Sequence, residues 1–288
     1  MPRLKKILFP IDFSEQCART ARAVCAWAND FKADVTLLHV TSLPLIPELA
    51  YPARLYRLVR KEVAQASAKA LDDFQKRHFS VLSVEGVLEE GDPGPSIVRY
   101  SREHRIDLIM MPTHGYGPFR RFLTGSVTAK VLHDALCPVW TSAHCPGSPS
   151  HGPRGYRDIL CAVDCDDEAV GLMRWASWLG RYGQSSVRLV HVIPALNETS
   201  RNRGEVALRK YFLRKAQEEF AVFEDRAGVC SEMIIRGGGI PNRLAETVQQ
   251  LHSDLLIVGR GKVRKTLGRL RTHSMAIIRE SHCPVLSV

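Results

Sequence analysis

The sequence DLIMMPTHGYGPFRRFLTGS, residues 107–126, joins an apolar strand pattern to the start of a helix pattern. The apolar run 108–111 predicts a buried strand, and glycine and polar residues follow it up to the helix. A loop that leaves the carboxyl end of a parallel strand and enters a helix directs backbone N–H groups and the positive end of the helix dipole toward one place. The stretch therefore predicts an anion site, where Gly115 and Gly125 allow close approach of the backbone and the Ser126 hydroxyl donates to a phosphate oxygen.

The glycine spacing in this loop is not that of a P-loop, because no Lys-Ser or Lys-Thr pair follows a suitably spaced glycine. Gly115 is followed by nine residues and then by the pair Gly125-Ser126. The spacing alone leaves two interpretations open. One is a phosphate-binding loop, and the other is a turn glycine followed by a helix N-cap.

The composition favours a globular protein of the cytoplasm. The chain has 288 residues, of which 45% are hydrophobic, and this is enough for one large core or two of ordinary size. No apolar run approaches the roughly 18 residues that span a bilayer, and Asp12 interrupts the apolar segment of the first residues before it resembles a signal peptide. The eight cysteines include no Cys-x-x-Cys pair and indicate small buried side chains rather than a disulfide framework. We therefore expect a cytoplasmic protein without a membrane partner.

The charge is strongly basic, with a net charge of +10 and a pI near 9.4, and this suggests an anionic partner. Both halves of the chain carry part of the excess, and one segment, residues 260–271, concentrates bases without an acid. Few aromatic residues are interleaved with these bases, so a platform for stacked nucleic-acid bases is not expected.

The chain is an internal repeat, because four blocks of its first half return in the same order in the second. The matched pairs are KKILFPIDFS (5–14) with RDILCAVDCD (157–166), VTLLHV (35–40) with VRLVHV (187–192), IDLIMM (106–111) with SDLLIV (253–258), and LCPVWT (136–141) with HCPVLS (282–287). The repeat predicts two domains of ordinary size, residues 1–142 and 157–288, joined by a linker at 143–156 that is rich in Pro, Gly, Ser and His.

Within each half, short β-branched runs alternate with longer helical patterns, which is typical of βαβ units. The fold class that we predict is α/β, with two tandem open five-stranded parallel sheets flanked by helices. The expected strands lie near residues 5–11, 34–40, 80–88, 107–112 and 137–142 and near 157–163, 185–192, 229–235, 254–259 and 283–288. The expected helices of the first half lie near 15–31, 54–77, 95–105 and 125–135. In the first of them Ala18, Ala21, Val24, Cys25, Ala28 and Phe31 share one face, and Ser14 is the expected N-cap.

Several short motifs carry a resemblance to a known family. They are PIDFS (10–14), LLHV (37–40), EGDPGPSIV (90–98), DLIMMPTHG (107–115), LTGSVTAKVL (123–132) and CPV (137–139). With these motifs the chain resembles a tandem universal stress protein, two Rossmann-like domains of the universal stress protein A family fused end to end. The nucleotide-binding branch of that family is marked by Gly-x2-Gly-x9-Gly-Ser/Thr. Gly115, Gly125 and Ser126 match its last three members, whereas Pro112 occupies the place of the first.

The resemblance implies that residues 1–142 bind ATP or a related adenine nucleotide, usually with a divalent metal such as Mg²⁺. It implies that Asp12, at the end of the first strand, faces the ribose and that Val40 offers its backbone to the adenine edge. It also implies that the glycine loop and the following helix start hold the phosphates. The candidate binding residues are Pro10, Asp12, Val40, Pro112, His114, Gly115, Arg120, Arg121, Gly125, Ser126 and Val127. Of these, His114 in the glycine loop is interpreted from its position as exposed enough to reach a phosphate, and Arg120 and Arg121 either contact the γ-phosphate or are solvated.

The second half departs further from the family pattern. Asp164 and Val192 persist at the ends of its first two strands, and Gly259 matches the first glycine, but Lys262 and the pair Arg271-Thr272 replace the later glycines and serine. Side chains at these positions block close approach of a polyphosphate to the backbone. Lys262 and Arg271 either neutralise a phosphate or form a solvated basic surface. We expect one ligand-binding half and one degenerate half.

Other chemistry-bearing residues are interpreted as structural. His39 and His191 end the second strands and are expected to be buried and bonded to neighbouring backbone. The linker residues His144, Cys145 and His151 lack zinc-finger spacing, so no metal site of the protein's own is expected. The three glycines 237–239 indicate a turn from strand to helix rather than a phosphate cradle.

No catalytic set emerges from the sequence, so we expect a stress-response binding or signalling module rather than a turnover enzyme. The alternatives are a nucleotide-free member of the family that acts through protein–protein interaction, a weak ATPase, and a nucleic-acid binder. The resemblance also implies pairing through the last strands, either as a pseudo-dimer of the two domains within one chain or as a homodimer.

Overall fold

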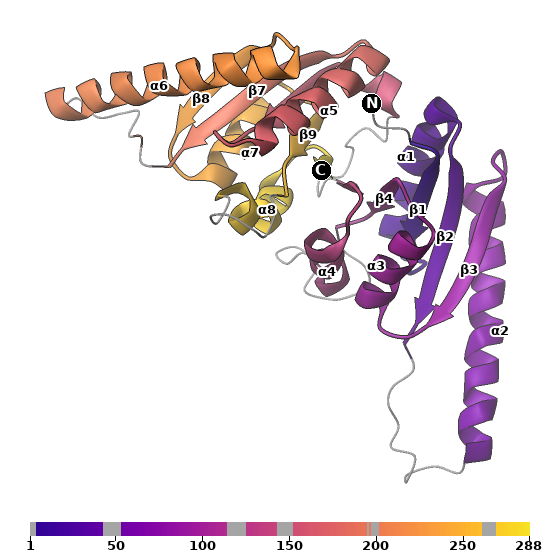
Figure 1. Cartoon of the computed structure of the whole chain (residues 1–288). Helices are drawn as coiled ribbons and strands as arrows, with labels where there is room; N and C mark the ends of the chain where they lie inside the picture. The colour runs from indigo at the N-terminus through magenta and orange to yellow at the C-terminus, as the bar shows by residue number, and fades with distance from the viewer. Residues whose placement is uncertain are drawn as a thin grey trace. The chain divides into compact units, whose positions relative to one another are not determined.

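The computed structural model divides the chain into two compact units, Arg3–Val139 and Trp140–Val288 (Figure 1). The structure describes residues 4–42, 53–113, 125–142, 152–194, 196, 202–260 and 269–288. Each unit is an α/β layered structure, as predicted. Within the described residues no helix is both long and apolar enough to cross a bilayer.

The first half alternates strands and helices. Its elements are β1 (Lys6–Pro10), α1 (Glu15–Phe31), β2 (Asp34–Thr41), α2 (Ala53–His78), β3 (Val84–Glu90), α3 (Pro93–Glu103), β4 (Leu108–Met111), α4 (Ser126–Asp134) and β5 (Val139–Thr141). The strands are ordered β3-β2-β1-β4-β5, and β1 pairs in parallel with both β2 and β4. Because crossovers between parallel strands are right-handed, the reversal of direction after β3 places α1 and α2 on one face of the sheet and α3 and α4 on the other.

Helices on both faces explain the apolar runs in the sequence. All four side chains of β4 are buried, and so are the last four of β1, because neither face of these strands meets water. Phe9 of β1 and Trp27 of α1 are fully buried at the centre of this core. The core therefore lies along β1 and β4, the two central strands.

The second half repeats this topology. After a short 3₁₀ turn η1 (Pro153–Gly155) come β6 (Asp158–Ala162), α5 (Glu168–Gly183), β7 (Ser186–Ile193), α6 (Arg203–Ala227), β8 (Glu232–Gly237), α7 (Ile240–Gln250), β9 (Leu255–Val258), α8 (Arg269–Glu280) and β10 (Val285–Ser287). The strand order is β10-β9-β6-β7-β8, and β6 pairs in parallel with β7 and β9. The two central strands of each unit have equivalent registers, with Ile7 opposite Leu108 and Ile159 opposite Leu255.

An aspartate before the fourth strand of each half joins that strand to the first. The Asp107 carboxylate accepts hydrogen bonds from the backbone N–H groups of Lys5 and Lys6 at 2.7 and 2.9 Å. Asp254 accepts the equivalent bonds from Arg157 and Asp158 at 2.7 and 3.1 Å. These bonds fix the amino ends of the central strands and use N–H groups that the sheet ladder leaves without partners. Sequence reasoning missed this role, although both aspartates stood in matched blocks.

A glycine closes the turn after the third strand in each half. Gly91 and Gly238 have φ of 151° and 118°, a region that favours glycine, and each is followed by the start of a helix. Their N–H groups donate to Thr41 and Ile193, the last residues of the second strands, at 3.0 and 3.2 Å. The expectation that residues 237–239 form a strand-to-helix turn is confirmed.

The expected elements differ from the observed ones mainly at their ends. Strand β3 was expected near residue 80 but begins at Val84, because α2 continues to His78 and a turn bond from Leu82 N–H to the Phe79 carbonyl follows it. The inward face of α1 was placed slightly off its true position. Cys17, Thr20 and Trp27 are buried there, whereas the predicted Ala18, Cys25 and Phe31 are half-buried.

Candidate functional site

The candidate site lies at the carboxyl edge of the first sheet, between β1 and β4. From β1 the chain proceeds outward through β2 to β3, and from β4 it proceeds the other way to β5, so the strand order reverses between these neighbours. Open α/β sheets bind ligands in the crevice at such a reversal. Asp12 follows β1 and Pro112 follows β4, so two of the candidate residues flank this point.

The carboxylate of Asp12 is held in place by the start of α1. Its Oδ1 accepts hydrogen bonds from the Ser14 N–H and from the Cys17 thiol, both at 3.0 Å. Burial, and secondly the negative charge of Asp12, raise the pKa of Cys17, so this side chain stays a neutral thiol that can donate. The Ser14 hydroxyl accepts from the Cys17 N–H at 3.3 Å and caps the helix, as predicted.

The end of β2 borders the same edge of the sheet. Val40 is almost fully buried, and its backbone takes part in the pairing of β2 with β3. The His39 ring donates from Nδ1 to the Ile11 carbonyl at 2.8 Å and lies against the Phe13 ring, with centroids 4.4 Å apart. The expected bond of His39 to a neighbouring backbone carbonyl is confirmed, but its side chain is half-buried rather than buried.

The start of α4 brings together the phosphate-binding candidates that the structure describes. Gly125 is the N-cap, with φ of −58° and ψ of 143°, and its N–H donates to the Thr113 carbonyl at 3.0 Å. Ser126 is the first helical residue and is exposed, while Val127 is half-buried. Because the first N–H groups of a helix have no partner within it, residues 126–128 direct donors out of the helix end.

The conformation of Gly125 does not itself require glycine, since its φ is negative. Its N–H donates to the Thr113 carbonyl, so the remaining property of the glycine is that it carries no Cβ. The buried Thr128, which sequence reasoning did not single out, donates from its hydroxyl to the Pro112 carbonyl at 3.2 Å. This bond ties the helix start to the end of β4.

His114, Gly115, Arg120 and Arg121 lie outside the described residues. The structure therefore places Asp12, Pro10, Val40, Pro112, Gly125, Ser126 and Val127 at one edge of the sheet and leaves the contribution of the four loop residues a prediction.

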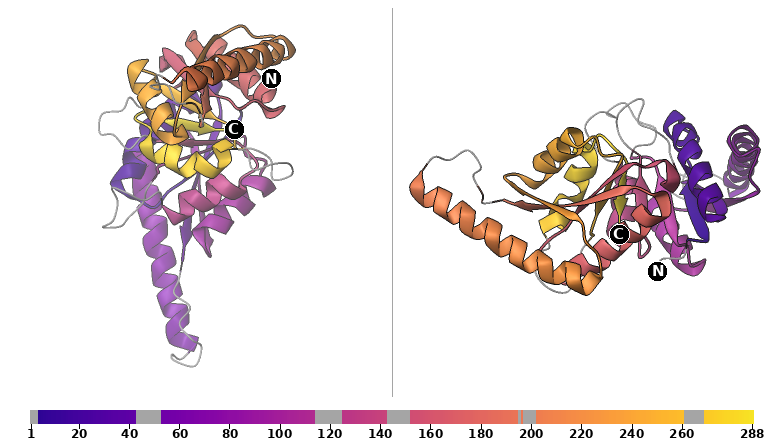
Figure 2. Two further views of the ribbon diagram at one scale, coloured as in Figure 1. Left: turned by 90° about the vertical axis from the view of Figure 1, so that its left-hand side faces the viewer. Right: turned by 90° about the horizontal axis from the view of Figure 1, so that it is seen from above.

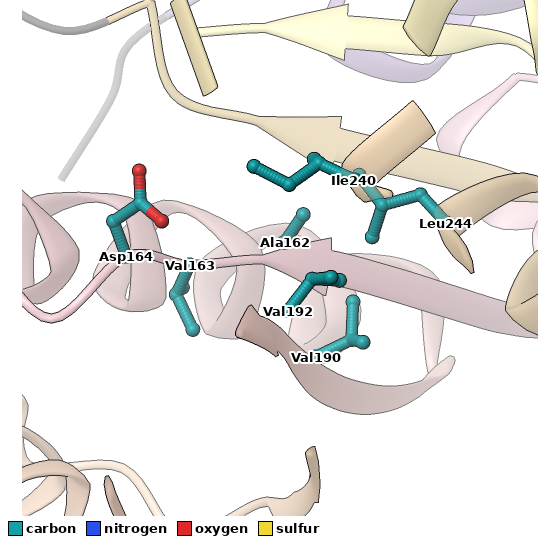
Figure 3. A pocket seen from close by; sticks show the side chains of 7 residues that line it. All are labelled: Ala162, Val163, Asp164, Val190, Val192, Ile240 and Leu244. Carbon is teal, nitrogen blue, oxygen red and sulfur yellow. The ribbon is translucent and has the colours of Figure 1, made fainter. Parts of the chain in front are cut away.

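The equivalent edge of the second half forms a shallow recess that is open to solvent (Figure 3). Apolar side chains from β6, β7 and α7 line it together with one carboxylate, and they are Ala162, Val163, Asp164, Val190, Val192, Ile240 and Leu244. Figure 3 shows Ile240 and Leu244 of α7 facing the strand residues, with Asp164 at the strand end. The described residues that line it include no basic group to give a polyphosphate a counter-charge, and the recess encloses too little space even for a water molecule, far less than a usual ligand pocket. Lys262 and the side chains of Arg271 and Thr272 lie outside the described residues.

Behind this edge lies a cluster of Cys165, His191 and Glu219 that the sequence reading did not identify. His191 donates from Nδ1 to the Val163 carbonyl at 2.8 Å, as expected for a strand-end histidine. Its Nε2 is therefore an acceptor, and it lies 3.7 Å from the Cys165 sulfur. Burial raises the pKa of Cys165 to about 12, and the nearby carboxylate of Glu219 adds to the rise. A thiol next to a histidine resembles a nucleophile pair, but here the thiolate is disfavoured.

We expect Cys165 to react slowly with alkylating reagents in the folded protein at mildly alkaline pH, because its thiolate is scarce. The exposed Cys230 is the internal reference, and Cys283, whose pKa burial also raises to about 12, is a second slow site. Brief treatment with iodoacetamide followed by peptide mass spectrometry measures the three rates. Labelling of Cys165 as fast as that of Cys230 would mean that His191 generates a thiolate.

The described residues offer no cluster suited to a metal ion. No group of three or more His, Cys, Asp or Glu side chains in the described ranges is arranged to hold a metal ion. The linker residues His144, Cys145 and His151 are not among those ranges. Where the structure is described, the site combines one positioned carboxylate with one helix start, and this arrangement is suited to binding.

The family model and the curated relatives that match this chain belong to the same family. The model of a family described as the universal stress protein family matches residues 3–142 and, a second time, residues 155–288. Universal stress protein MJ0531 of Methanocaldococcus jannaschii is 30% identical over 137 residues, which cover 47% of this chain and 79% of the relative. Universal stress protein YxiE of Bacillus subtilis is 26% identical over 141 residues, which cover 46% of this chain and 95% of the relative.

Solved structures agree with the fold. A universal stress protein from Archaeoglobus fulgidus is similar over 98% of this chain and 95% of its own, with a TM-score of 0.65 and 18% sequence identity. A protein from Pseudomonas aeruginosa PAO1, described as functionally unknown, is similar over 99% of this chain and 92% of its own, with a TM-score of 0.63 and 16% identity. At such identities the likeness shows the fold alone.

Proposed function

Because the chain belongs to the universal stress protein family, with one family domain in each half, we propose that its first half binds ATP or a related adenine nucleotide. In this proposal the protein acts in the stress response as a binding or signalling module. The second half is a degenerate domain that does not bind a polyphosphate.

The observation that carries the proposal is the convergence of a carboxylate and a helix start at the reversal of strand order. Asp12 and Pro112 follow the two neighbouring strands β1 and β4, and Thr128 ties the start of α4 to Pro112. A helix N-terminus attracts phosphate through its N–H groups and its dipole. A carboxylate accepts several hydrogen bonds at once, so Asp12 can bind a ribose hydroxyl while it is held by Ser14 and Cys17.

Each candidate residue has a distinct role in this proposal. The N–H groups of Ser126 and Val127 and the Ser126 hydroxyl donate to phosphate oxygens, and Gly125 leaves room for the phosphate. Pro10 and Val40 border the nucleoside. The loop residues His114, Gly115, Arg120 and Arg121 complete the phosphate site. Pro112 supplies no N–H, so binding is weaker than in a loop with glycine at this position.

Magnesium enters this proposal with the nucleotide. In the described part of the site the one candidate carboxylate is Asp12, and Mg²⁺ held by a protein together with ATP commonly uses one or two carboxylates, phosphate oxygens and water. The residues present therefore fit a metal that the triphosphate brings. When bound, the ion would neutralise phosphate charge.

Titration of the full-length protein with fluorescently labelled ATP and Mg²⁺ tests the proposal. Gly125→Val should weaken binding by about tenfold or more, since a branched side chain at the N-cap blocks phosphate from the helix start and one lost contact of this kind costs at least 1.4 kcal/mol. Pro112→Gly should strengthen binding because it restores an N–H. The matched control is Gly239→Val at the N-cap of α7, where a Cβ would meet no atom within 4 Å, and its affinity should equal that of the unchanged protein.

Two outcomes would contradict the proposal. One is absence of binding at millimolar nucleotide by a folded protein that also carries no excess absorbance at 260 nm, which favours the nucleotide-free alternative. The other is equal affinity of the Gly125→Val and Gly239→Val variants, which would place the ligand away from α4. Steady phosphate release that Asp12→Ala abolishes would instead identify a weak ATPase.

A further inference from the structure

The second helix of each half begins with several turns that bury none of their described side chains fully. Within the described side chains, α2 has no buried residue before Leu71, and α6 has none before Ala216. At about 1.5 Å per residue, the stretch without a buried side chain is roughly 27 Å long in α2 and roughly 20 Å in α6. Figures 1 and 2 show that the first turns of each helix extend past the strands of its own unit.

In α2 the outward face of these turns combines an apolar side chain with bases. Leu58 is 51% exposed, and Arg54 and Lys61, four residues before and three residues after it, lie on the same face of the helix. Arg57 is also exposed. Among the described residues no ion pair engages these three bases, whereas Arg60 points to the body of the unit and bonds to Glu90 at 3.0 Å.

The first turns of α6, the equivalent helix of the second half, also expose apolar side chains beside bases. Leu208 and Tyr211 are 52% and 51% exposed and lie one turn apart, and Lys215 follows one turn later on that face. Arg214 and Lys215 approach Glu218 and Glu219 only at 3.6 and 3.7 Å, as exposed pairs. Pairs of this kind contribute little, so the bases stay available to another anion.

The charges of these turns determine which partner can approach. Residues 54–61 contain four bases and no acid, and residues 203–215 contain five bases and one acid. The positive end of each helix dipole lies at the same end. Contact with the same surface of a second copy would bring like charges together, which opposes self-association. The complementary partner is therefore anionic.

The exposed apolar side chains decide between two anionic partners. A nucleic-acid backbone would meet the bases but would leave Leu58, Leu208 and Tyr211 without a function. A bilayer surface with anionic lipids attracts bases to its headgroups and takes Leu and Tyr side chains into the boundary with the acyl chains. We propose that the first turns of α2, and separately the first turns of α6, each form a peripheral binding surface for an anionic lipid bilayer. The sequence-based expectation of no membrane partner rested on the lack of a spanning stretch, and a helix on the surface needs none.

Co-sedimentation of the full-length protein with lipid vesicles tests this surface. The protein should bind vesicles of equal parts phosphatidylglycerol and phosphatidylcholine, bind pure phosphatidylcholine vesicles at least about tenfold more weakly, and lose affinity as salt is raised. The variant Arg54→Glu, Arg57→Glu, Lys61→Glu should bind the anionic vesicles at least about tenfold more weakly. Arg22→Glu, Arg102→Glu, Arg181→Glu is the matched control, because it makes the same change in net charge at exposed positions elsewhere.

A second variant separates a bilayer from a nucleic acid. Leu58→Ser, Leu208→Ser, Tyr211→Ser leaves the charge unchanged and should weaken vesicle binding by about tenfold. Circular dichroism melting confirms that each variant is folded. The proposal is overturned if the anionic vesicles are not bound, if the control weakens binding as much as the helix variants do, or if the apolar variant binds as the unchanged protein does. If the protein does not bind vesicles but binds duplex DNA, and the apolar variant binds DNA as tightly as the unchanged protein, the surface is a nucleic-acid surface instead.

Discussion

Replacing Asp107 by alanine should lower the free energy of unfolding by about 2–3 kcal/mol, although the residue is far along the chain from its partners. Its carboxylate holds the N–H groups of Lys5 and Lys6, and hydrogen bonds to a charged acceptor are stronger than neutral ones. Without the carboxylate these N–H groups depend on water, and the amino ends of β1 and β4 lose their link. Urea unfolding followed by circular dichroism measures the loss.

Two companion variants define the cause. Asp254→Ala should have a comparable effect on the second half, because Asp254 makes the equivalent bonds to Arg157 and Asp158. Asp72→Ala removes an exposed aspartate of α2 that pairs with Lys76 and should change stability little. If Asp107→Ala unfolds at the same urea concentration as the unchanged protein, the bonds do not contribute to stability.

Gly180→Ala and Gly171→Ala, the same substitution at two positions of α5, should change stability in opposite directions. A Cβ on Gly180 would lie 2.3 Å from Cγ2 of Val187 in β7, closer than real Cβ contacts, so α5 would have to move away from the sheet. We expect a loss of about 2–3 kcal/mol. A Cβ on Gly171 would meet nothing within 4 Å, and there alanine should add about 0.5–1 kcal/mol because it favours the helix. Thermal unfolding of both variants makes the comparison.

A double variant tests whether the contact with Val187 causes the loss of stability in Gly180→Ala. Val187→Ala removes the methyl group that the new Cβ would strike, so Gly180→Ala should cost less in that background than in the unchanged protein. Equal losses in both backgrounds would mean that another contact is responsible.

The fold was predictable because each half of the repeat contains the same order of apolar strand patterns and helix patterns, so the topology could be inferred independently from both halves. Runs such as Leu108–Met111 are apolar throughout, and this is expected only of strands covered on both faces. The end of α2 was less predictable, since the four residues from Ser80 to Ser83 continue neither a helix nor a strand pattern clearly. The turn bond between Leu82 and Phe79 is a tertiary outcome that local propensity does not encode.

The candidate site was predictable in its positions and less so in its bonds. The pattern placed Asp12, Gly125 and Ser126 at strand and helix ends, where the structure has them. It gave no sign that the Cys17 thiol donates to Asp12, because a cysteine in a helix pattern is most simply a small apolar residue. The contact between Cys165 and His191 joins residues 26 positions apart and had one weak signal, namely cysteine in the place that Phe13 takes beside His39.

The position of the two aspartate anchors has a consequence for how the halves could diverge. Asp107 and Asp254 act at the amino ends of the strands, whereas Asp12 and Asp164 stand at the carboxyl ends. Substitutions at the carboxyl ends of the strands therefore leave the bonds of Asp107 and Asp254 intact. A domain that no longer needs to bind a ligand can change its residues at that edge and still fold. Duplication followed by such substitutions would produce one domain that keeps the original ligand site and one whose corresponding edge can acquire a different function.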